Sequence, residues 1–267
     1  MCSSVFNHDE AMRWGSFIKS VYSVERKVSD ANALLEIGLP DWKIIAGISI
    51  EPSLFKWHSE EWIGCVMESL TDPSRKGIVY RGTETELEWI DDFEFFLLSY
   101  TEPGGVGKVE EGFGRMYRSL KVHLLEEEKS LLMTEYAQNL QAGSLTVAGH
   151  SLGGALTVLT AYAAAFCGME TEVYTFGSPM VGDRTFTSAY EKLVPSTWRI
   201  YNAPDIVPKL PASELGFTQP EVGIQVNSLD IPGSGRGLAE YHKMDTYLMS
   251  ISQQKTNDSN QNNEKVG

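Results

Sequence analysis

The sequence contains few cysteines. Only Cys2, Cys65 and Cys167 occur among the 267 residues. Three cysteines do not make the disulfide framework of a small secreted domain. Cys65 and Cys167 are expected to be small hydrophobic residues of the core. This composition, and an N-terminus without a basic region followed by an apolar region, predicts a reducing cytoplasmic location and leaves secretion open.

The chain also has little positive charge and no long apolar run. There are 22 Lys and Arg against 36 Asp and Glu, a net charge of −14. We expect no nucleic-acid binding, because a protein that binds phosphates needs clustered Lys and Arg residues. The same charge weakens attraction to anionic membrane surfaces. No run of about 18 apolar residues is present, so no integral membrane segment is expected.

Hydrophobic patterning predicts one domain with an α/β fold over residues 1–252. No internal repeat or Pro/Gly/Ser linker divides the chain. The remaining residues, 253–267, are polar and lack aromatics, which predicts a disordered tail. Strands alternate with helices through the middle of the chain, and this pattern is typical of a mostly parallel central sheet covered by helices on both faces.

The predicted elements follow from the periodicity and from turn residues. Strands are expected at Lys43–Ile50, Trp62–Leu70, Gly77–Arg81, 144–148, Thr171–Phe176, Thr197–Asn202 and Gly223–Ser228. Helices are expected at Glu10–Tyr22, Leu87–Leu98, Gly112–Gln141, 152–167, Thr185–Lys192 and Tyr241–Ile251. The helix over Gly112–Gln141 is either continuous or interrupted.

The most informative motif is "GHSLGG", residues 149–154, between an apolar strand and an Ala-rich helix. Ser151 is either a nucleophile on a sharp strand-to-helix turn or the N-cap of the following helix. The glycines favour the nucleophile. A side chain at Gly149 or Gly153 would collide with the neighbouring strand and helix, while Gly154 keeps the helix close to the sheet.

A serine nucleophile needs a base and an acid, which follow it in the order acid, then histidine in this architecture. Of the five histidines, only His242 follows Ser151. Asp205 is the favoured acid because it lies just past a β-rich run, in "YNAPDIVPKLP". Asp183 is expected to cap a helix and Asp230 to lie near a surface turn. His150 is expected to point away from the serine and to pack.

Two segments are candidates for the oxyanion hole. Leu152 begins the helix after Ser151, so its N–H points to where a substrate oxyanion would form. Thr83, in "YRGT", follows the strand 77–81 and could add its N–H and its hydroxyl. An ordinary strand-ending turn explains "RGT" equally well.

These motifs, in this order, resemble the class 3 lipase family of α/β-hydrolases, which includes fungal triacylglycerol lipases, feruloyl esterases and plant phospholipases A1. The matching segments are "YRGTETELEWIDDF", "EEGFGRM", "VAGHSLGGA", "TFGSPMVGD", "YNAPDIVPKLP" and "HKMDTYL". The resemblance implies an α/β-hydrolase fold with Ser151, Asp205 and His242 as the triad and Thr83 and Leu152 as the oxyanion hole. It also implies that Asp92 supports the oxyanion hydroxyl.

The segment after Thr83 is either a buried helix or a short helical lid over an acyl-binding site. Its apolar residues include Leu87, Trp89, Ile90, Phe93, Phe95 and Phe96. Acidic residues such as Glu84, Glu88 and Glu94 make one face polar, which favours a hinged amphipathic cover. Because this negative charge repels anionic headgroups, the expected substrates are neutral acylglycerols met at a lipid–water interface.

The sequence thus predicts a serine-dependent lipase that forms an acyl-enzyme and needs no metal or organic cofactor. Feruloyl or short-chain esterase and phospholipase A1 are the alternatives within the enzyme class. A catalytically silent lipase-like protein that binds or signals is the alternative from another class, and the complete set of triad residues argues against it.

Overall fold

The computed structural model describes residues 5–24, 34, 37–51, 60–83, 95–127 and 129–264. Within these ranges the predicted α/β architecture is confirmed. No helix among the described residues is long and apolar enough to cross a membrane.

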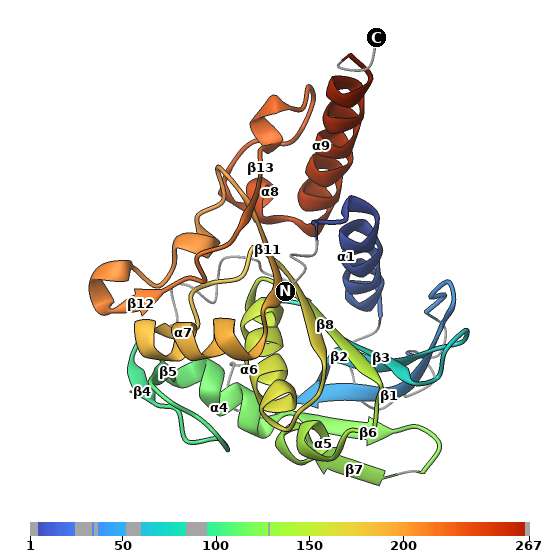
Figure 1. Ribbon diagram of the computed structural model, residues 1–267, viewed down its shortest axis with the longest axis vertical. Coiled ribbons are helices and arrows are strands. Elements are labelled where there is room, and N and C mark those ends of the chain that lie inside the picture. The colour runs from blue at the N-terminus through green and yellow to red at the C-terminus, as the bar shows by residue number, and fades with distance from the viewer. Residues whose placement is uncertain are drawn as a thin grey trace.

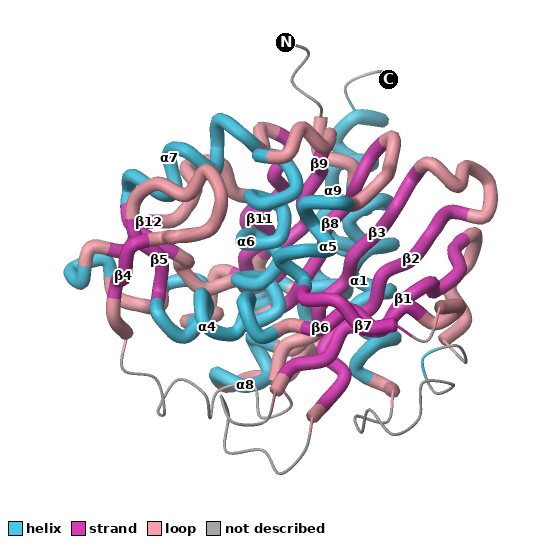
Figure 2. The backbone as a smooth tube through the Cα atoms, turned by 90° about the horizontal axis from the view of Figure 1, so that it is seen from below, coloured by secondary structure: helices cyan, strands magenta, loops and turns pink. Residues whose placement is uncertain are grey.

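A nine-stranded mixed sheet lies at the centre of the described structure, in the order β13-β11-β9-β8-β3-β2-β1-β6-β7 (Figure 1). Neighbours from β13 to β3 are parallel, whereas neighbours from β3 to β7 are antiparallel. Figure 2 shows β9, β8, β3, β2 and β1 side by side in this order. The strands are β1 (Trp42–Ile50), β2 (Glu61–Ser69), β3 (Arg75–Tyr80), β6 (Lys121–Leu124), β7 (Lys129–Leu132), β8 (Ser144–His150), β9 (Thr171–Phe176), β11 (Ser196–Asn202) and β13 (Ile224–Val226).

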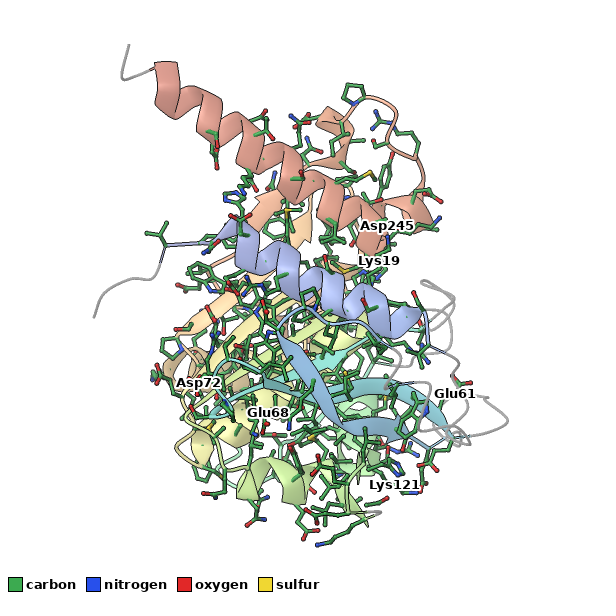
Figure 3. All side chains as sticks on the ribbon, turned by 90° about the vertical axis from the view of Figure 1, so that its right-hand side faces the viewer. Lys19, Glu61, Glu68, Asp72, Lys121 and Asp245 are labelled. Carbon is green, nitrogen blue, oxygen red and sulfur yellow. The ribbon has the colours of Figure 1, made fainter. Side chains whose placement is uncertain are left out.

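Helices cover both faces of this sheet. One face packs against α4 (Glu111–Ser119), α5 (Met133–Asn139), α6 (Leu152–Phe166) and α7 (Arg184–Leu193). The other face packs against α1 (His8–Tyr22) and α9 (Met244–Glu264). Figure 3 shows α1 lying between α9 and the sheet. The short helix α8 (Leu238–His242) precedes α9.

A small antiparallel sheet flanks the main one, in the order β12-β10-β5-β4. Its strands are β4 (Leu97–Ser99), β5 (Lys108–Glu110), β10 (Gly182–Asp183) and β12 (Phe217–Thr218). Short 3-10 turns, η2 (Val207–Lys209), η3 (Ser213–Leu215) and η4 (Ser228–Asp230), interrupt the loops near the C-terminal end.

The central helix α6 is buried on every side from Leu152 to Ala164. Alanine and threonine side chains are small enough to let a helix lie close to a sheet on one side and to other helices on the other. The predicted Ala-rich helix after Ser151 is therefore confirmed, and it is a buried helix.

The helix predicted over Gly112–Gln141 is interrupted, and two strands that were not predicted occupy its middle. The helix α4 ends at Ser119, and the chain then forms the hairpin of β6 and β7 before α5 begins. The reason is tertiary: β6 pairs with β1 and extends the main sheet. A local helical pattern gives way where backbone groups can pair with a strand that is already in place. Leu97 and Leu98, predicted to be helical, lie in β4.

The predicted disorder of the C-terminal tail does not match the structure, in which α9 continues to Glu264. Tyr247 and Ile251 are buried and fix the first turns of this helix. Once a helix is nucleated, each further residue extends it at little cost. The polar extension also lies beside α1, where Lys255 pairs with Asp9 and His8 Nε2 lies 3.5 Å from Asp258 Oδ2.

The two described cysteines differ in burial. Cys65 lies in the core on β2, as predicted, and burial raises the pKa of its thiol to about 12. Cys167, also predicted to be a core residue, is exposed. It follows α6 as the C-terminal cap residue, where the chain leaves the core.

We expect iodoacetamide to modify Cys167 in the folded protein and to leave Cys65 unmodified, because the reactive thiolate of Cys65 is both buried and scarce. Peptide mass spectrometry after native labelling measures this. The protein unfolded in guanidinium is the control and should be labelled at both positions. Equal labelling of the two cysteines in the folded protein would contradict the burial of β2.

Candidate active site

The turn between β8 and α6 places Ser151 in a strained conformation. Ser151 has φ 58° and ψ −128°, a region that residues other than glycine rarely occupy. It stands at the N-cap position of α6, but its side chain makes no capping hydrogen bond. Its N–H donates to the Phe176 carbonyl at 2.9 Å. The serine is therefore held by its backbone, and its hydroxyl is not used as a helix cap.

Glycines allow this turn to form, as predicted. A Cβ at Gly149 would lie 2.3 Å from the Gly153 carbonyl oxygen, and a Cβ at Gly153 would lie 2.4 Å from the Arg81 carbonyl oxygen. A Cβ at Gly154 would lie 2.6 Å from the Cβ of Ser178. Because the obstructing atoms at the first two positions are backbone atoms, they cannot rotate away.

We expect Gly153→Ala to lower the free energy of unfolding by about 1–3 kcal/mol, because the added methyl forces α6 away from the end of β3. Urea unfolding measures this. Gly38→Ala is the matched control, since a Cβ at Gly38 meets no atom of the described residues within 4 Å. We expect it to change stability by less than about 0.5 kcal/mol. Equal stability of Gly153→Ala and the unsubstituted protein would contradict the close approach.

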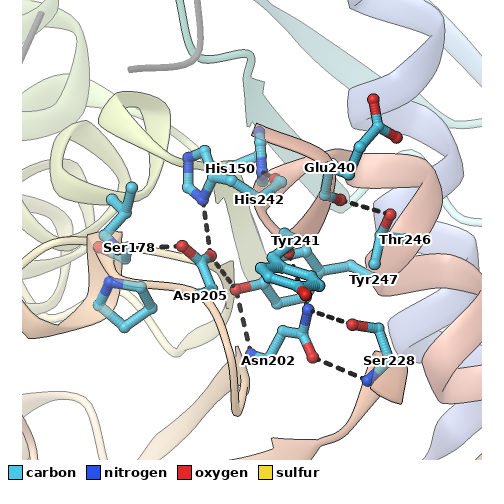
Figure 4. A network of polar contacts seen from close by, with 12 residues as sticks. His150, Ser178, Asn202, Asp205, Ser228, Glu240, Tyr241, His242, Thr246 and Tyr247 are labelled. Carbon is cyan, nitrogen blue, oxygen red and sulfur yellow. Dashed lines mark hydrogen bonds and ion pairs between the residues drawn. The ribbon is translucent and has the colours of Figure 1, made fainter. Parts of the chain in front are cut away.

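Asp205 and His242 form a buried ion-pair geometry next to this turn (Figure 4). His242 Nδ1 lies 2.6 Å from Asp205 Oδ2, and both side chains are fully buried. The Val207 N–H donates to the other carboxylate oxygen, Oδ1, at 2.9 Å. The aspartate is therefore oriented on both oxygens, and it fixes the direction of the imidazole ring.

Two further residues, Tyr247 and Asn202, hold this pair, and neither is among the residues predicted from the sequence. The Tyr247 hydroxyl donates to Asp205 Oδ2 at 2.6 Å and accepts from the Asn202 N–H at 3.1 Å. Burial, and then the negative charge of Asp205, raise the pKa of Tyr247 well above its usual value, so the phenol stays a donor. The sequence feature that could have identified Tyr247 is its position in "HKMDTYL", one helical turn and a residue beyond His242.

Asn202, the last residue of β11, links the segment that carries Asp205 to the segment that carries His242. Its amide nitrogen Nδ2 donates to Ser228 Oγ at 2.9 Å and to the Tyr241 carbonyl at 2.8 Å (Figure 4). Its amide oxygen accepts from the Ser228 N–H at 2.9 Å. Asn202 thereby fixes the peptide that directly precedes His242.

The remaining polar atoms of the site have no partner among the described residues. Ser151 Oγ and His242 Nε2 are both buried, and neither makes a hydrogen bond within those ranges. Gly177 packs closely against His242: a Cβ at Gly177 would lie 2.9 Å from His242 Cε1. Gly177 directly follows Phe176, whose carbonyl binds the Ser151 N–H. The structure therefore brings Ser151, His242 and Asp205 to one end of the parallel strands.

The two predicted oxyanion residues lie beside Ser151. Leu152 is the first residue of α6, so its amide belongs to the helix N-terminus. Thr83 is buried and follows Gly82, where a Cβ would lie 2.8 Å from the Cβ of Ser151. The strand-ending turn "RGT" thus lies against the serine, as an oxyanion segment requires.

The other residues predicted from the sequence lie in other parts of the fold or outside the described residues. Asp183 caps α7, accepting from the Phe186 N–H at 2.9 Å, and Asp230 is exposed in η4, both as predicted. Of the predicted lid and acyl-binding residues, Phe95 packs partly against the core and Phe96 is exposed. Asp92 and the lid residues Leu87, Trp89, Ile90 and Phe93 lie outside the described residues.

No cluster in the described ranges of the chain combines three or more His, Cys, Asp or Glu side chains in a way that could hold a metal ion.

Comparison with known proteins points to lipid-cleaving enzymes. Residues 77–215 match the family model described as Lipase (class 3). The chain is 32% identical over 197 residues to the chloroplastic phospholipase A1-Igamma2 of Arabidopsis thaliana, covering 62% of this chain and 37% of the relative. It is 29% identical over 255 residues to phospholipase A1-IIbeta of the same plant, covering 80% of this chain and 59% of the relative.

Structural comparison gives the same fold. The structure of a Rhizomucor miehei lipase propeptide complex matches with a TM-score of 0.62 and 22% identity, over 90% of this chain and 77% of that chain. At this identity the likeness supports the fold alone. The chain covers 37% and 59% of the lengths of the two plant relatives, so their activities do not transfer to it directly.

Proposed function

Because the chain belongs to the class 3 lipase family, we propose that it is a serine ester hydrolase that cleaves acyl esters of lipids. Ser151 is the nucleophile, His242 the general base and acid, and Asp205 the residue that orients the histidine. The family match includes Ser151 and Asp205, while His242 lies beyond it.

One observation carries this proposal. A strained serine with an unused hydroxyl lies at the same strand ends as an imidazole that is fixed through Nδ1 and has its Nε2 unpaired within the described residues. Backbone strain and buried unpaired polar atoms both cost free energy. Sites that accept a substrate are where proteins tolerate such costs.

The first half of the reaction forms an acyl-enzyme. As Ser151 Oγ attacks the ester carbonyl carbon, its proton passes to His242 Nε2, and the tetrahedral intermediate carries the negative charge on the former carbonyl oxygen. The Leu152 N–H and Thr83 stabilise this oxyanion. His242 then gives its proton to the leaving alcohol oxygen as the carbon–oxygen bond breaks.

The second half releases the fatty acid. Water loses a proton to His242 and attacks the acyl carbon, and the proton returns to Ser151 Oγ as that bond breaks. Asp205 takes no proton from the histidine and stabilises the imidazolium formed in each half. Its bonds from Val207 and Tyr247 keep the imidazole in the tautomer that presents Nε2 to the serine.

We expect Ser151→Ala to abolish ester hydrolysis and labelling by a fluorophosphonate, and Thr83→Ala to lower kcat by about 10²–10³-fold, because one oxyanion donor is lost. Steady-state kinetics with p-nitrophenyl esters of graded chain length and gel-based labelling measure these effects. Thr160→Ala, in the buried middle of α6, is the control for side-chain truncation away from the site.

Hydrolysis by Ser151→Ala at the unsubstituted rate would refute the nucleophile. If the purified, folded protein neither labelled nor hydrolysed any ester, the proposal would fail in favour of the silent binding protein.

The proposed substrates are neutral acylglycerols. The chain carries a net charge of −14, which opposes binding to anionic surfaces. Phe96 and Leu98, at the C-terminal end of the predicted lid segment, expose 54% and 50% of their surface. Exposed apolar side chains of this kind are suited to a lipid surface. Phospholipase A1 activity is the second candidate, because the plant relatives carry that name.

We expect tributyrin emulsions to be hydrolysed faster than vesicles of anionic phosphatidylglycerol, since the protein is repelled by the anionic surface. Vesicles of zwitterionic phosphatidylcholine separate the effect of surface charge from that of the phosphate group. Titration of released fatty acid measures all three rates under matched salt. A strong preference for anionic vesicles would overturn the neutral-lipid proposal and favour the phospholipase.

A further inference from the structure

His150, the residue before the proposed nucleophile, is a buried histidine that the mechanism above does not use. The sequence predicted that it packs and points away from the serine. It is fully buried, but both of its ring nitrogens make hydrogen bonds. Nδ1 lies 2.8 Å from the Tyr22 hydroxyl, and Nε2 lies 2.7 Å from the backbone carbonyl oxygen of His242.

When the His150 ring is neutral, donor and acceptor roles in this cluster have one consistent assignment. The carbonyl of His242 only accepts, so His150 Nε2 carries the proton and Nδ1 is the acceptor. Tyr22 therefore donates its hydroxyl proton to Nδ1. The same oxygen accepts from the Gly82 N–H at 2.7 Å. Burial, and then the nearby His242, lower the pKa of His150 well below its usual value, which matches a neutral ring.

This chain of bonds connects three parts of the proposed site that are far apart in sequence. Gly82 precedes the oxyanion residue Thr83, His150 precedes Ser151, and the carbonyl belongs to His242 itself. The residue that joins them, Tyr22, is the last residue of α1. The rings of His150 and His242 also lie 4.7 Å apart between centroids, so the two histidines pack together.

Helix α1 is itself anchored to the helix that follows His242. Lys19 Nζ lies 2.5 Å from Asp245 Oδ1, one turn before Tyr22 and three residues after His242 (Figure 3). A Cβ at Gly15 would lie 2.8 Å from the side chains of Met244 and Leu248, so α1 and α9 approach closely. Tyr22 thus has a fixed position relative to the segment that carries His242.

We propose that Tyr22 and His150 are positioning residues of the active site, which hold the oxyanion segment and the backbone of His242 in register with Ser151. This inference rests on the proposed function. Asp205 fixes the ring of His242 through its side chain, and His150 fixes the same residue through its carbonyl. A displacement of about 1 Å between reacting groups lowers the reaction rate. Loss of a hydrogen bond can cause such a displacement even when neither of its partners touches the substrate.

The test is Tyr22→Phe, which keeps the ring and removes the hydroxyl. We expect kcat to fall about tenfold while KM stays nearly constant, because transition-state geometry is lost and substrate contacts are not. Tyr190→Phe is the matched control. Tyr190 is also buried and bonds through its hydroxyl to Thr197 Oγ1 at 2.9 Å, on α7. We expect it to leave kcat unchanged.

A double-mutant cycle separates positioning from general destabilisation. In the Thr83→Ala background we expect Tyr22→Phe to lower kcat by less than about threefold, because the oxyanion segment it positions is already impaired. Fully multiplicative effects, or a loss that only follows the fraction unfolded by thermal melting, would overturn the proposal.

A spectroscopic readout is independent of activity. In ¹⁵N NMR of the Ser151→Ala protein, which keeps the cluster, His150 should appear as the neutral ring with the proton on Nε2. Tyr22→Phe added to this protein should shift His150 Nδ1 and the Gly82 amide. Unshifted signals, or a proton on Nδ1, would overturn the inference even if ester hydrolysis is confirmed. If no ester is hydrolysed, the proposed function fails, and the predicted shifts alone support or overturn the hydrogen-bond chain.

Discussion

The site depends on how closely the first turn of α6 approaches the backbone of β3. Gly153 lies against the Arg81 carbonyl, and Gly149 against the Gly153 carbonyl, with no room for a methyl group at either position. This packing bends the chain sharply at Ser151 and leaves its hydroxyl free of any capping role. Without it, the helix N-terminus and the end of β3 would lie too far apart to stabilise the oxyanion of the proposed reaction together.

Parallel strands explain why residues distant in sequence meet here. The strands β3, β8, β9 and β11 run in one direction, so their carboxyl ends share one edge of the sheet. Thr83, Ser151, Gly177 and Asp205 follow these strands and therefore gather at that edge. His242 arrives by a different route, through a loop that Asn202 holds from the end of β11.

The sequence predicted the parallel half of the sheet well, because each of those strands is a short apolar run flanked by turn residues. It predicted the glycine turn and the Asp205–His242 pairing for another reason: few residues of the right type lie in the right order. The hairpin of β6 and β7 was missed, since its pairing with β1 is invisible locally. Tyr22, Asn202 and Tyr247 were missed because hydrogen-bond partners up to 128 residues apart leave no periodic signal.

The two ends of the main sheet have a further consequence. Its edge strands in the described structure are short, with three residues in β13 and four in β7. Exposed sheet edges invite pairing with another chain, and short edge strands limit it. The short edge strands β13 and β7 therefore limit the pairing of this sheet with a second copy of the chain.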